Sequence, residues 1–480
     1  MHLRVDRRDP RRLAEQVFSA VKAMILDGAL REGLRLPPTR AAARDAGVSR
    51  TVMVEAYDRL AAEGYIDGRH GSGTFVAGGV AFRRPLAPEP ARLEPVGFRP
   101  LRFDLVDFRS GVPDLARFPI GLWRRLTGRV LDGLKPADLA YAAPEGRPEL
   151  RAAIADYLRQ ARGVRCHPEQ ILVTSGTTQA VGIVSTILLN GRRRTAVVED
   201  PVTRDIRHII AHRGGRPRPV PLDEAGLMVG RIPSRPAPSF IYVTPSHQYP
   251  LGMTMPAERR IELLERAAAW GAFVVEDDYD SEFRHELPPT SSLQELDPGR
   301  VIYVGSFSKT LFPALRTGFL VLPPALLARA RLSKWEIDLH NPTVDQLVLA
   351  AFIAGGHFAR HVERMRRLYR RKRDLVLAGL AAGFGRRAAP FGSEVGMHLA
   401  VRFAGVRFDQ ATLSRLAEAG VVVYPVAMHA SRPEDYLDCA ILGFGHLEER
   451  RIEEGLSILA RSLGERKRRG SGQRNPYTTS

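Results

Sequence analysis

Cysteine is almost absent from this chain. Only Cys166 and Cys439 occur among its 480 residues, which is too few for a disulfide framework or a zinc site. The sequence also lacks an apolar run of membrane-spanning length, and its charged start at residues 1–8 lacks the apolar core of a signal peptide. These absences predict a cytoplasmic protein that has no membrane partner.

Lysine is scarce as well, although the chain is strongly basic. Six lysines stand among 71 Lys and Arg residues, which exceed the 53 Asp and Glu residues and give a formal net charge of +18. Such a balance favours polyanionic partners, nucleic acid first, but an arginine-rich coding habit gives the same figure. The length of 480 residues predicts two or three domains.

One of the six lysines lies between two predicted strands. Lys309 follows an apolar run at 301–304 and precedes another at 319–322, and short runs bounded by Gly and Pro are typical of buried strands. A buried lysine amine has a lowered pKa and can form a Schiff base, although this pattern alone also fits a lysine that snorkels at a strand end. The segment also supplies groups that suit a phosphate dianion: Ser306, Ser308, Thr310 and Arg316.

The start of the chain predicts a winged helix-turn-helix. Apolar residues recur at helical spacing over 13–25, and a short second helix is expected over 40–46 behind an N-cap at Thr39. Ser49 is expected to cap a third helix, and the Gly-rich stretch 65–76 predicts a β-hairpin. This arrangement sets the third helix at an angle suited to the major groove. Its expected inward face is Val52, Ala56, Tyr57 and Leu60.

This stretch resembles the GntR family of bacterial transcription regulators over nearly all of residues 10–77. The matching segments are 36–40, 47–51, 56–60, 63–65 and 71–76. Helix starts and a wing tip can meet phosphates and base edges, while a solvated surface charge is the alternative for any single arginine. The resemblance implies that double-stranded operator DNA is contacted by Arg40, Ser49, Arg50, Thr51, Arg69, His70 and Gly71.

The domain organisation follows from shifts in composition. After the hairpin, five prolines are spread without a period, which favours an extended spacer. The last residues are basic and are expected to be disordered, either as a solvated tail without a role or as an aid to nonspecific DNA binding. The predicted divisions are the DNA-binding domain 1–78, the linker 79–102, the effector domain 103–463 and the tail 464–480.

From about residue 103 the pattern is typical of an α/β sheet protein, because helical stretches alternate with short apolar runs. The run 171–174 leads into a Gly and hydroxyls at a helix start, which forms an anion site because free N–H groups and the helix dipole converge there. The run 272–280 places carboxylates and a phenol at the C-terminal end of a strand, where ligands collect in open α/β sheets. Further strands are expected at 196–201 and from 240 onward.

Residues of about 105–460 resemble a fold-type I pyridoxal-phosphate aminotransferase. Together with the first domain, the whole chain resembles the MocR-type subfamily of GntR regulators. The matching phrases are Pro245–Gly252, Val275–Arg284 and Ser306–Arg316. The expected fold class is therefore multi-domain: a winged helix-turn-helix, α with a β-wing, followed by an α/β aminotransferase-like domain.

The resemblance assigns roles in binding the cofactor pyridoxal 5'-phosphate. Lys309 is implied to form the Schiff base, Asp277 to sit at the pyridine nitrogen, and Tyr279 to donate to the phenolate oxygen with His247 or Gln248 beside it. The residues implied to hold the phosphate are Gly176, Thr177, Ser306, Ser308 and Arg316. Tyr141 is implied to reach the phosphate of the opposite subunit, because this fold places its sites at a homodimer interface.

The chain departs from the family at three positions. Thr203 stands where relatives usually have a tyrosine that stacks on the cofactor ring, and Thr178 stands where a glutamine is common. Ile441 replaces the arginine that usually grips a substrate carboxylate, a contact typically worth about two orders of magnitude in affinity. We therefore expect no efficient transamination of ordinary α-amino acids.

These observations lead to a regulator whose DNA binding responds to a small molecule. The first candidate effector is pyridoxal phosphate itself, which makes the protein a sensor of vitamin B6 status, and the second is an amino compound without an α-carboxylate anchor. The rival interpretation is a competent pyridoxal-phosphate aminotransferase tethered to DNA. A third interpretation is a vestigial cofactor site in a domain that only dimerises.

Overall fold

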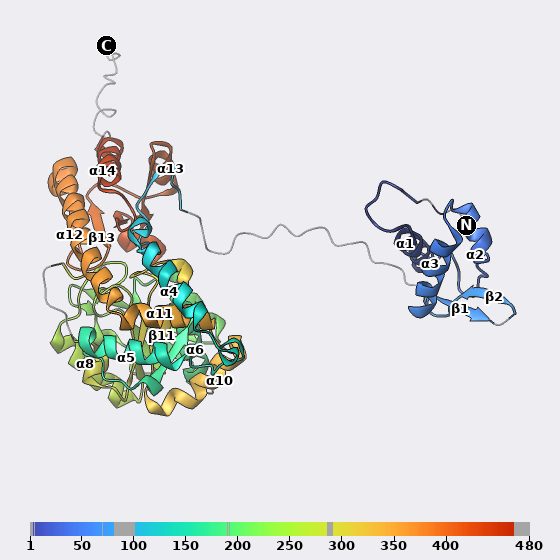
Figure 1. Cartoon of the computed structure of the whole chain (residues 1–480). Helices are drawn as coiled ribbons and strands as arrows, with labels where there is room; N and C mark the ends of the chain where they lie inside the picture. Colours follow the sequence, from blue (N-terminus) through green and yellow to red (C-terminus); the bar gives the residue numbers. More distant parts are fainter. Residues whose placement is uncertain are drawn as a thin grey trace, which may run out of the picture. The chain divides into compact units, whose positions relative to one another are not determined.

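A computed structural model describes residue 3 and the ranges 5–69, 71–80, 101–189, 191, 193–285 and 291–464. The chain forms two compact units, Met1–Arg99 and Pro100–Ser480 (Figure 1). Of the sequence-based predictions, His70 at the wing tip, most of the linker at 81–100 and the tail at 465–480 lie outside the described residues.

The first unit is a winged helix-turn-helix, as the sequence predicts. Three helices precede an antiparallel two-stranded wing in which Ile66 pairs with Val76. The elements are α1 (Leu13–Leu26), α2 (Thr39–Asp45), α3 (Arg50–Ala62), β1 (Ile66–Arg69) and β2 (Gly73–Val76). The wing and the helices share one apolar core, because Val76 packs in the same cluster as Val17 of α1 and Leu60 of α3.

Of three local predictions for this unit, the cap of α2 is wrong, the inward face of α3 lacks one buried residue, and the cap of α3 is confirmed. Thr39 is the first residue of α2, and the N-cap is Pro38, whose backbone is extended and which has no side-chain donor or acceptor. On the inward face of α3, Ala56, Tyr57 and Leu60 are buried as predicted, Val52 is half-buried against the same core, and the neighbouring Met53 is fully buried. Ser49 does cap α3, and its hydroxyl accepts a hydrogen bond from the Val52 N–H at 3.3 Å.

The second unit is built around an eight-stranded sheet. Its order is β4-β11-β10-β9-β8-β5-β6-β7, in which β5, β6, β8, β9 and β10 are parallel to their neighbours within that group and β11 is antiparallel to both β10 and β4. The strands are β4 (Ile171–Thr174), β5 (Thr195–Asp200), β6 (Arg216–Asp223), β7 (Gly226–Leu227), β8 (Phe240–Val243), β9 (Phe273–Asp278), β10 (Val301–Ser306) and β11 (Gly318–Val321). A mostly parallel sheet is covered on both faces, which explains its continuous apolar runs.

Helices cover the two faces of this sheet. Ile302 and Val304 of β10 pack in a cluster with α6, whereas Tyr303 packs in a second cluster that contains α5, α11 and α12. Alternate strand residues point to opposite faces, so one strand feeds both clusters. The helices are α4 (Ile120–Asp132), α5 (Pro148–Arg162), α6 (Thr177–Leu188), α7 (Arg204–His212), α8 (Ala257–Trp270), α9 (Leu293–Leu296), α10 (Leu327–Asp338), α11 (Thr343–Ala354) and α12 (His357–Phe384).

A smaller antiparallel sheet follows α12, with strand order β12-β13-β16-β15. The long helix α12 runs beside both sheets and packs on α11 near its start and on α14 near its end (Figure 1). The remaining elements are β3 (Val106–Asp107), β12 (Ala388–Phe391), β13 (His398–Phe403), α13 (Gln410–Glu418), β14 (Val421–Val422), β15 (Tyr424–Pro425), β16 (Cys439–Gly443) and α14 (Glu449–Gly464). The short β3 pairs with β14, which ties the start of the unit to its end.

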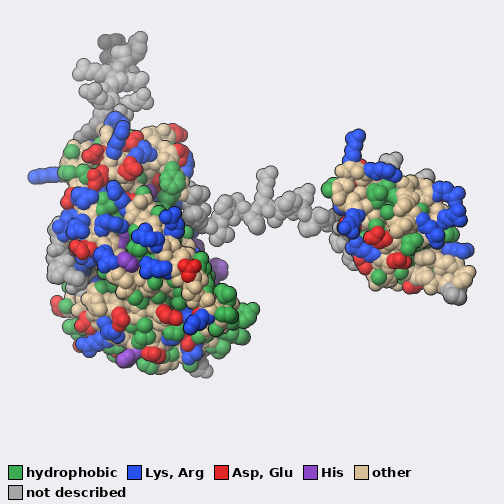
Figure 2. Space-filling model, in the orientation of Figure 1, with side chains coloured by type: hydrophobic (Ala, Val, Ile, Leu, Met, Phe, Trp, Pro, Cys, Tyr) green, Lys and Arg blue, Asp and Glu red, His purple; other side chains and the backbone are tan. Residues whose placement is uncertain are grey.

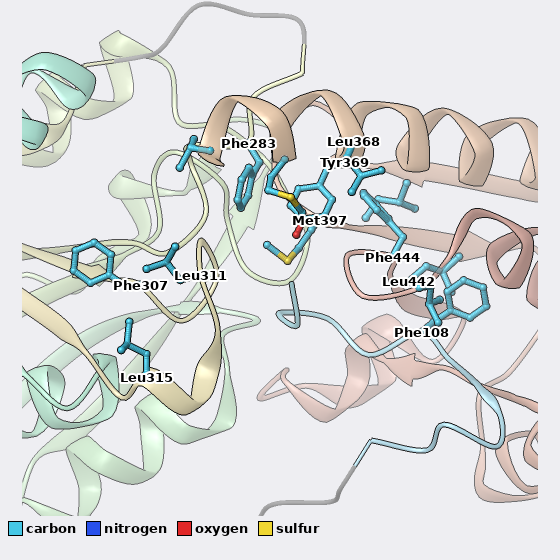
Figure 3. Close-up of a cluster of buried hydrophobic side chains, with 14 of the residues drawn as sticks. Phe108, Phe283, Phe307, Leu311, Leu315, Leu368, Tyr369, Met397, Leu442 and Phe444 are labelled. Atoms are coloured by element: carbon cyan, nitrogen blue, oxygen red, sulfur yellow. The ribbon is translucent and has the colours of Figure 1, made fainter. Parts of the chain in front are cut away.

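The segment that carries Lys309 is anchored on the apolar core. Phe307, Leu311 and Leu315 are buried on either side of it in the sequence. Figure 3 shows these three side chains near one another, in the same cluster as Tyr369 of α12 and Met397. Burial of three large apolar side chains contributes several kcal/mol, so the backbone around Lys309 is held firmly.

None of the helices in the described ranges combines the length and apolar character that a membrane span requires.

Candidate functional site

The predicted DNA contacts that the structure describes lie on the surface of the first unit. All six are exposed: Arg40, Ser49, Arg50, Thr51, Arg69 and Gly71. Arg40 is in the first turn of α2, whereas Ser49, Arg50 and Thr51 surround the N-terminus of α3. A helix N-terminus with free N–H groups and flanking arginines suits a phosphate. The residues that the sequence predicts to contact DNA are therefore exposed on the surface of the first unit, where DNA can reach them.

The wing adds one arginine that the sequence does not single out. Arg35 bridges to Phe75 of β2, and a Cβ added to Gly73 would lie 2.8 Å from the Arg35 Nε. On the other wing strand, the Arg69 guanidinium lies 4.8 Å from the centre of the Phe75 ring. The wing thus has the Arg35 side chain beside Gly73 and the Arg69 guanidinium over the Phe75 ring.

Lys309 lies between β10 and β11 with its side chain directed at the start of the second unit. Its Nζ donates a hydrogen bond to the Gly111 carbonyl at 2.8 Å, and Gly111 has φ +73. Burial lowers the pKa of Lys309, Asp280 and Asp277 oppose this shift, and Arg316 adds to it. A lowered pKa leaves more of the amine unprotonated and nucleophilic at neutral pH.

Asp277, near the end of β9, is buried with one oxygen unpartnered. Its Oδ2 accepts a short hydrogen bond from the Tyr242 hydroxyl, and its Oδ1 has no hydrogen-bond partner among the described residues. Burial raises the pKa of Asp277 to about 7, with Tyr242 acting in the opposite direction. A buried carboxylate oxygen of this kind fits a cationic N–H donor such as a ring nitrogen.

Tyr279, His247 and Asp280 form a connected polar group beside Asp277. The His247 Nδ1 donates to the Asp280 carboxylate at 2.8 Å, and the Tyr279 hydroxyl lies 3.1 Å from the same nitrogen. Burial lowers the pKa of His247 to about 3 and raises the pKa of Asp280 to about 7. The imidazole is therefore neutral, and Asp280 fixes its orientation. The His398 ring packs 4.7 Å from His247.

Two of the predicted cofactor residues are directed elsewhere. The Gln248 amide donates to the Pro201 carbonyl at 2.9 Å and lies 3.3 Å from Glu199, so it ties the β8 end to the β5 end. Of the two alternatives beside Tyr279, the structure therefore brings His247 into place. Tyr141 is 87% exposed and packs edge-on against the His340 ring. Within the described part of one chain, no hydrogen bond joins Tyr141 to the other candidates.

The residues that the sequence assigns to phosphate binding lie around the N-terminus of α6. Gly176 is its N-cap with φ +96, and a Cβ added there would lie 3.2 Å from a guanidinium nitrogen of Arg316. Arg316 itself donates to the Ser175 carbonyl at 2.5 Å, and the Ser306 hydroxyl accepts from the Ser308 N–H. Thr177 is the first residue of the helix. A helix N-terminus, an arginine and two hydroxyls form an anion site.

The position that usually grips a carboxylate is apolar. Ile441 is 0% exposed on β16 and packs with Leu251, Ala400 and Val426. Thr203 is half-buried at the start of α7, and Thr178 is exposed in the first turn of α6. The side chain at position 441 therefore packs in an apolar cluster and carries no charge that could hold a carboxylate.

Sequence reasoning misses three residues that complete the site. Gly111 accepts from Lys309, Tyr242 donates to Asp277, and Asp280 orients His247. Asp280 belongs to the same acidic stretch of sequence as Asp277, so this stretch could have marked Asp280 as a site residue. Gly111 is 198 positions from Lys309 in sequence and is recognisable only once the chain is folded.

The arrangement can hold an aromatic cation and a phosphate near a nucleophilic amine. The first unit has the build of a DNA-binding domain, and the second has the fold of an aminotransferase. Together they define a transcription regulator with an aminotransferase-like domain.

Comparison with known proteins identifies the family. The model "Bacterial regulatory proteins, gntR family" matches residues 13–76, and "Aminotransferase class I and II" matches residues 105–435. The chain is 36% identical over 459 residues to the probable rhizopine catabolism regulatory protein MocR of Rhizobium meliloti, covering 92% of each protein. It is 33% identical over 368 residues to the pyridoxine biosynthesis transcriptional regulator PdxR of Corynebacterium glutamicum, covering 77% of this chain and 79% of PdxR. This chain belongs to the MocR-type family of gntR regulators, as its resemblance predicts.

A solved structure supports the same fold for the second unit. LysN, the α-aminoadipate aminotransferase of Thermus thermophilus complexed with N-(5'-phosphopyridoxyl)-L-leucine, matches with a TM-score of 0.69 and 29% identity. The match covers 75% of this chain and 92% of LysN. The aminotransferase fold is therefore shared over nearly the whole length of that enzyme.

Proposed function

We propose that this regulator is a cytoplasmic homodimer that binds pyridoxal phosphate at Lys309 and adjusts its grip on operator DNA in response. The first unit contacts the DNA through the α2, α3 and wing residues described above, including Arg40, Arg50 and Arg69. A ligand shifts DNA binding only if it binds two arrangements of the protein unequally. A covalent bond that forms and breaks at Lys309 supplies such a difference.

The observation that carries this proposal is the pairing of a buried amine with a half-satisfied buried carboxylate. Lys309 has its pKa lowered by burial, and Asp277 keeps one oxygen without a partner among the described residues. When bound, pyridoxal phosphate supplies an aldehyde that a lysine amine can bond covalently. Asp277 would accept from the ring nitrogen and keep it protonated, and Tyr279 would donate to the ring oxygen with His247 beside it.

The phosphate is assigned to the N-terminus of α6. Gly176 lets the backbone approach closely, and Arg316 supplies the positive charge. Thr177, Ser306 and Ser308 add hydrogen-bond donors from the helix start and the lysine segment. This part of the site binds and orients and has no role in moving protons.

The vitamer is the first choice of effector because the carboxylate end of the site is apolar. Ile441 packs against Leu251, Ala400 and Val426, so the side chain at this position offers an amino acid no charged partner. An amino compound without an α-carboxylate anchor is the second choice. The name of PdxR, a pyridoxine biosynthesis regulator, also favours a vitamin B6 response.

Exposed apolar residues support the homodimer. Tyr141 is 87% exposed and contacts His340 at the end of α10, the helix that also exposes Trp335. Large exposed aromatic side chains are typical of an interface. The proposal places Tyr141 against the phosphate site of the partner subunit.

The effector assignment is tested by titration of DNA binding. A duplex selected by the protein from a random-sequence pool serves as the operator, and its affinity is measured with increasing pyridoxal phosphate or with a panel of amino compounds. We expect the affinity to change with the vitamer. No response to the vitamer together with a response to an amine discards the first choice in favour of the second.

The rival function is a competent aminotransferase tethered to DNA. It is favoured by the intact set of Lys309, Asp277 and Tyr279 and opposed by Ile441. An enzyme changes its absorbance with an amino acid and regains the starting spectrum with a keto acid, whereas a sensor of the vitamer does not complete this cycle. If the site is vestigial, Lys309→Ala leaves both spectrum and regulation unchanged.

A further inference from the structure

One face of α12 carries a row of arginines that the cofactor site does not use. Arg360, Arg364, Arg367 and Arg371 follow one another at spacings of four, three and four residues, which places them on one side of the helix. Arg364, Arg367 and Arg371 are exposed. The row rises over about 16 Å along the helix. Over the same length of duplex axis, one DNA strand carries about five phosphates. We call these four residues, together with Arg117, the arginine row.

Arg117 joins the row from the turn before α4. Arg117, Arg364, Arg367 and Arg371 line a surface recess of about 160 Å³ whose floor is Met365 and Leu368. Arg364 donates a hydrogen bond to the Arg117 carbonyl at 3.1 Å, which fixes the two elements together. On the face shown in Figure 2, Lys and Arg side chains gather over the middle of the second unit.

Carboxylates neutralise the arginine row only in part. Glu363 lies 3.4 Å from Arg367, and Glu449 lies 3.4 Å from Arg371. Nearby α4 adds positive charge, because Arg125 and Arg129 act with Arg360 to lower the pKa of His357, although burial is the largest cause. Five arginines therefore face two glutamates, and the surface keeps a net positive charge. A purely structural role is served poorly by so many like charges.

We propose that the arginine row binds the phosphate backbone of DNA that flanks the operator. Its partner must be a polyanion with a regular array of charges, and the first unit brings such a molecule to this chain. Attachment of one unit to the operator raises the effective concentration of the flanking duplex around the other unit. This contact is independent of the cofactor.

The chain between the units sets how far from the operator the row can bind. Residues 81–100 separate the described parts, and 20 residues span at most about 70 Å. That distance corresponds to about 20 base pairs of duplex at about 3.4 Å each. The row is therefore predicted to contact DNA within about two helical turns of the operator.

The test compares full-length variants on short and long duplexes. One duplex contains only the selected operator, and the other adds about 25 base pairs of unrelated sequence on each side. In the fourfold variant Arg117→Gln, Arg364→Gln, Arg367→Gln and Arg371→Gln, we expect the affinity for the long duplex to fall at least about tenfold. The slope of log K against log salt should fall by about 2 to 4, at about 0.9 for each lost phosphate contact. Affinity for the short duplex should stay unchanged.

A matched control removes the same charge elsewhere. The exposed arginines at positions 216, 218, 231 and 235, changed together to Gln, should leave both duplexes bound as before. An equal loss in this control, or no loss in the fourfold variant, overturns the proposal. A change in oligomeric state on sedimentation also overturns it, because a second copy of the chain then covers the row. If the fourfold variant misfolds, the pair Arg117→Gln and Arg367→Gln keeps the Arg364 hydrogen bonds and should show about half the change in slope.

Discussion

Around Lys309 the candidate site is polar, whereas around Ile441 it is apolar. At the first end, Asp277, His247 and Asp280 are buried, charged or hydrogen-bonded, and arranged about a nucleophilic amine. At the second end, Ile441 packs against the aliphatic side chains of Leu251, Ala400 and Val426. Both ends lie in one unit with one fold, yet only the first retains the chemistry that an aminotransferase site needs.

The contrast separates holding a cofactor from gripping a substrate. Buried polar groups are destabilising unless a partner satisfies them, so an empty polar end gains from a ligand. The apolar end has no such unpaired polar group at Ile441 and gains nothing there from a ligand. A site that keeps the first end and loses the second suits a protein that responds to a cofactor without turning over amino acids.

The largest expected effect is at the amine itself. Lys309→Ala should abolish the dependence of operator affinity on pyridoxal phosphate, because Lys309 is the buried amine whose pKa is lowered and which the proposal bonds to the vitamer. The exposed Lys135→Ala is the matched control and should respond as the unchanged protein does. If the operator affinity of Lys309→Ala still changes with pyridoxal phosphate, the polar end of the site is not where the effector acts.

The second effect breaks the apolar end. Ile441→Arg places an unpaired charge among Leu251, Ala400 and Val426 and should lower the free energy of unfolding by about 3 kcal/mol or more. Ile441→Met keeps the volume and should lower it by less than about 1.5 kcal/mol. Denaturant unfolding measures both. If Ile441→Arg is stable and binds an amino acid, the packing around position 441 does not exclude a carboxylate, and the side chain of Ile441 alone accounts for the difference between the two ends.

The third effect is a pH dependence from Asp277. In the unfolded chain this carboxyl loses its proton near 3.8, whereas burial holds the folded pKa at about 7. Between these values the folded state binds more protons, so stability falls as pH rises from about 4 to 7. Asp277→Asn should make this fall shallower by up to about 1.4 kcal/mol per pH unit.

Unfolding of the cofactor-free protein at several pH values measures this slope. Asp132→Asn, at an exposed position, is the control. An unchanged slope in Asp277→Asn would show that the polar end carries no such penalty.

The smallest effect lies outside both ends. Ser49→Ala removes the N-cap of α3 and should destabilise the first unit by about 1 kcal/mol. The absorbance of the second unit with pyridoxal phosphate should not change. Ser49→Asp preserves an acceptor and should restore the stability. A spectral change in Ser49→Ala would mean that the ends of the site are not independent of the DNA-binding unit.

Much of the fold could be predicted because strong local patterns coincide with it. The buried strands β9 and β10 are short apolar runs in sequence, and Ser49 is a capping residue at the start of an apolar-periodic helix. On the inward face of α3 the buried Met53 was missed beside the half-buried Val52, since both are apolar and only packing separates them. Thr39 was misassigned because a residue before the helix, Pro38, already occupied the cap.

The site was predictable at the level of residue types but not of partners. The sequence assigns Lys309 and Asp277 through a family resemblance, and it leaves His247 and Gln248 as alternatives. Only the folded chain shows that His247 lies at Tyr279 while Gln248 ties two strand ends together. Gly111 carries no local pattern that marks it, because its contact with Lys309 depends on chain segments far apart in sequence.

The most direct test of the account is the near-ultraviolet and visible spectrum of the purified full-length protein before and after addition of pyridoxal phosphate, followed by borohydride and peptide mass mapping. The account predicts a new visible absorbance and a stable mass increase confined to the peptide that contains Lys309. A protein that stays colourless, or that is modified equally at Lys135, contradicts it.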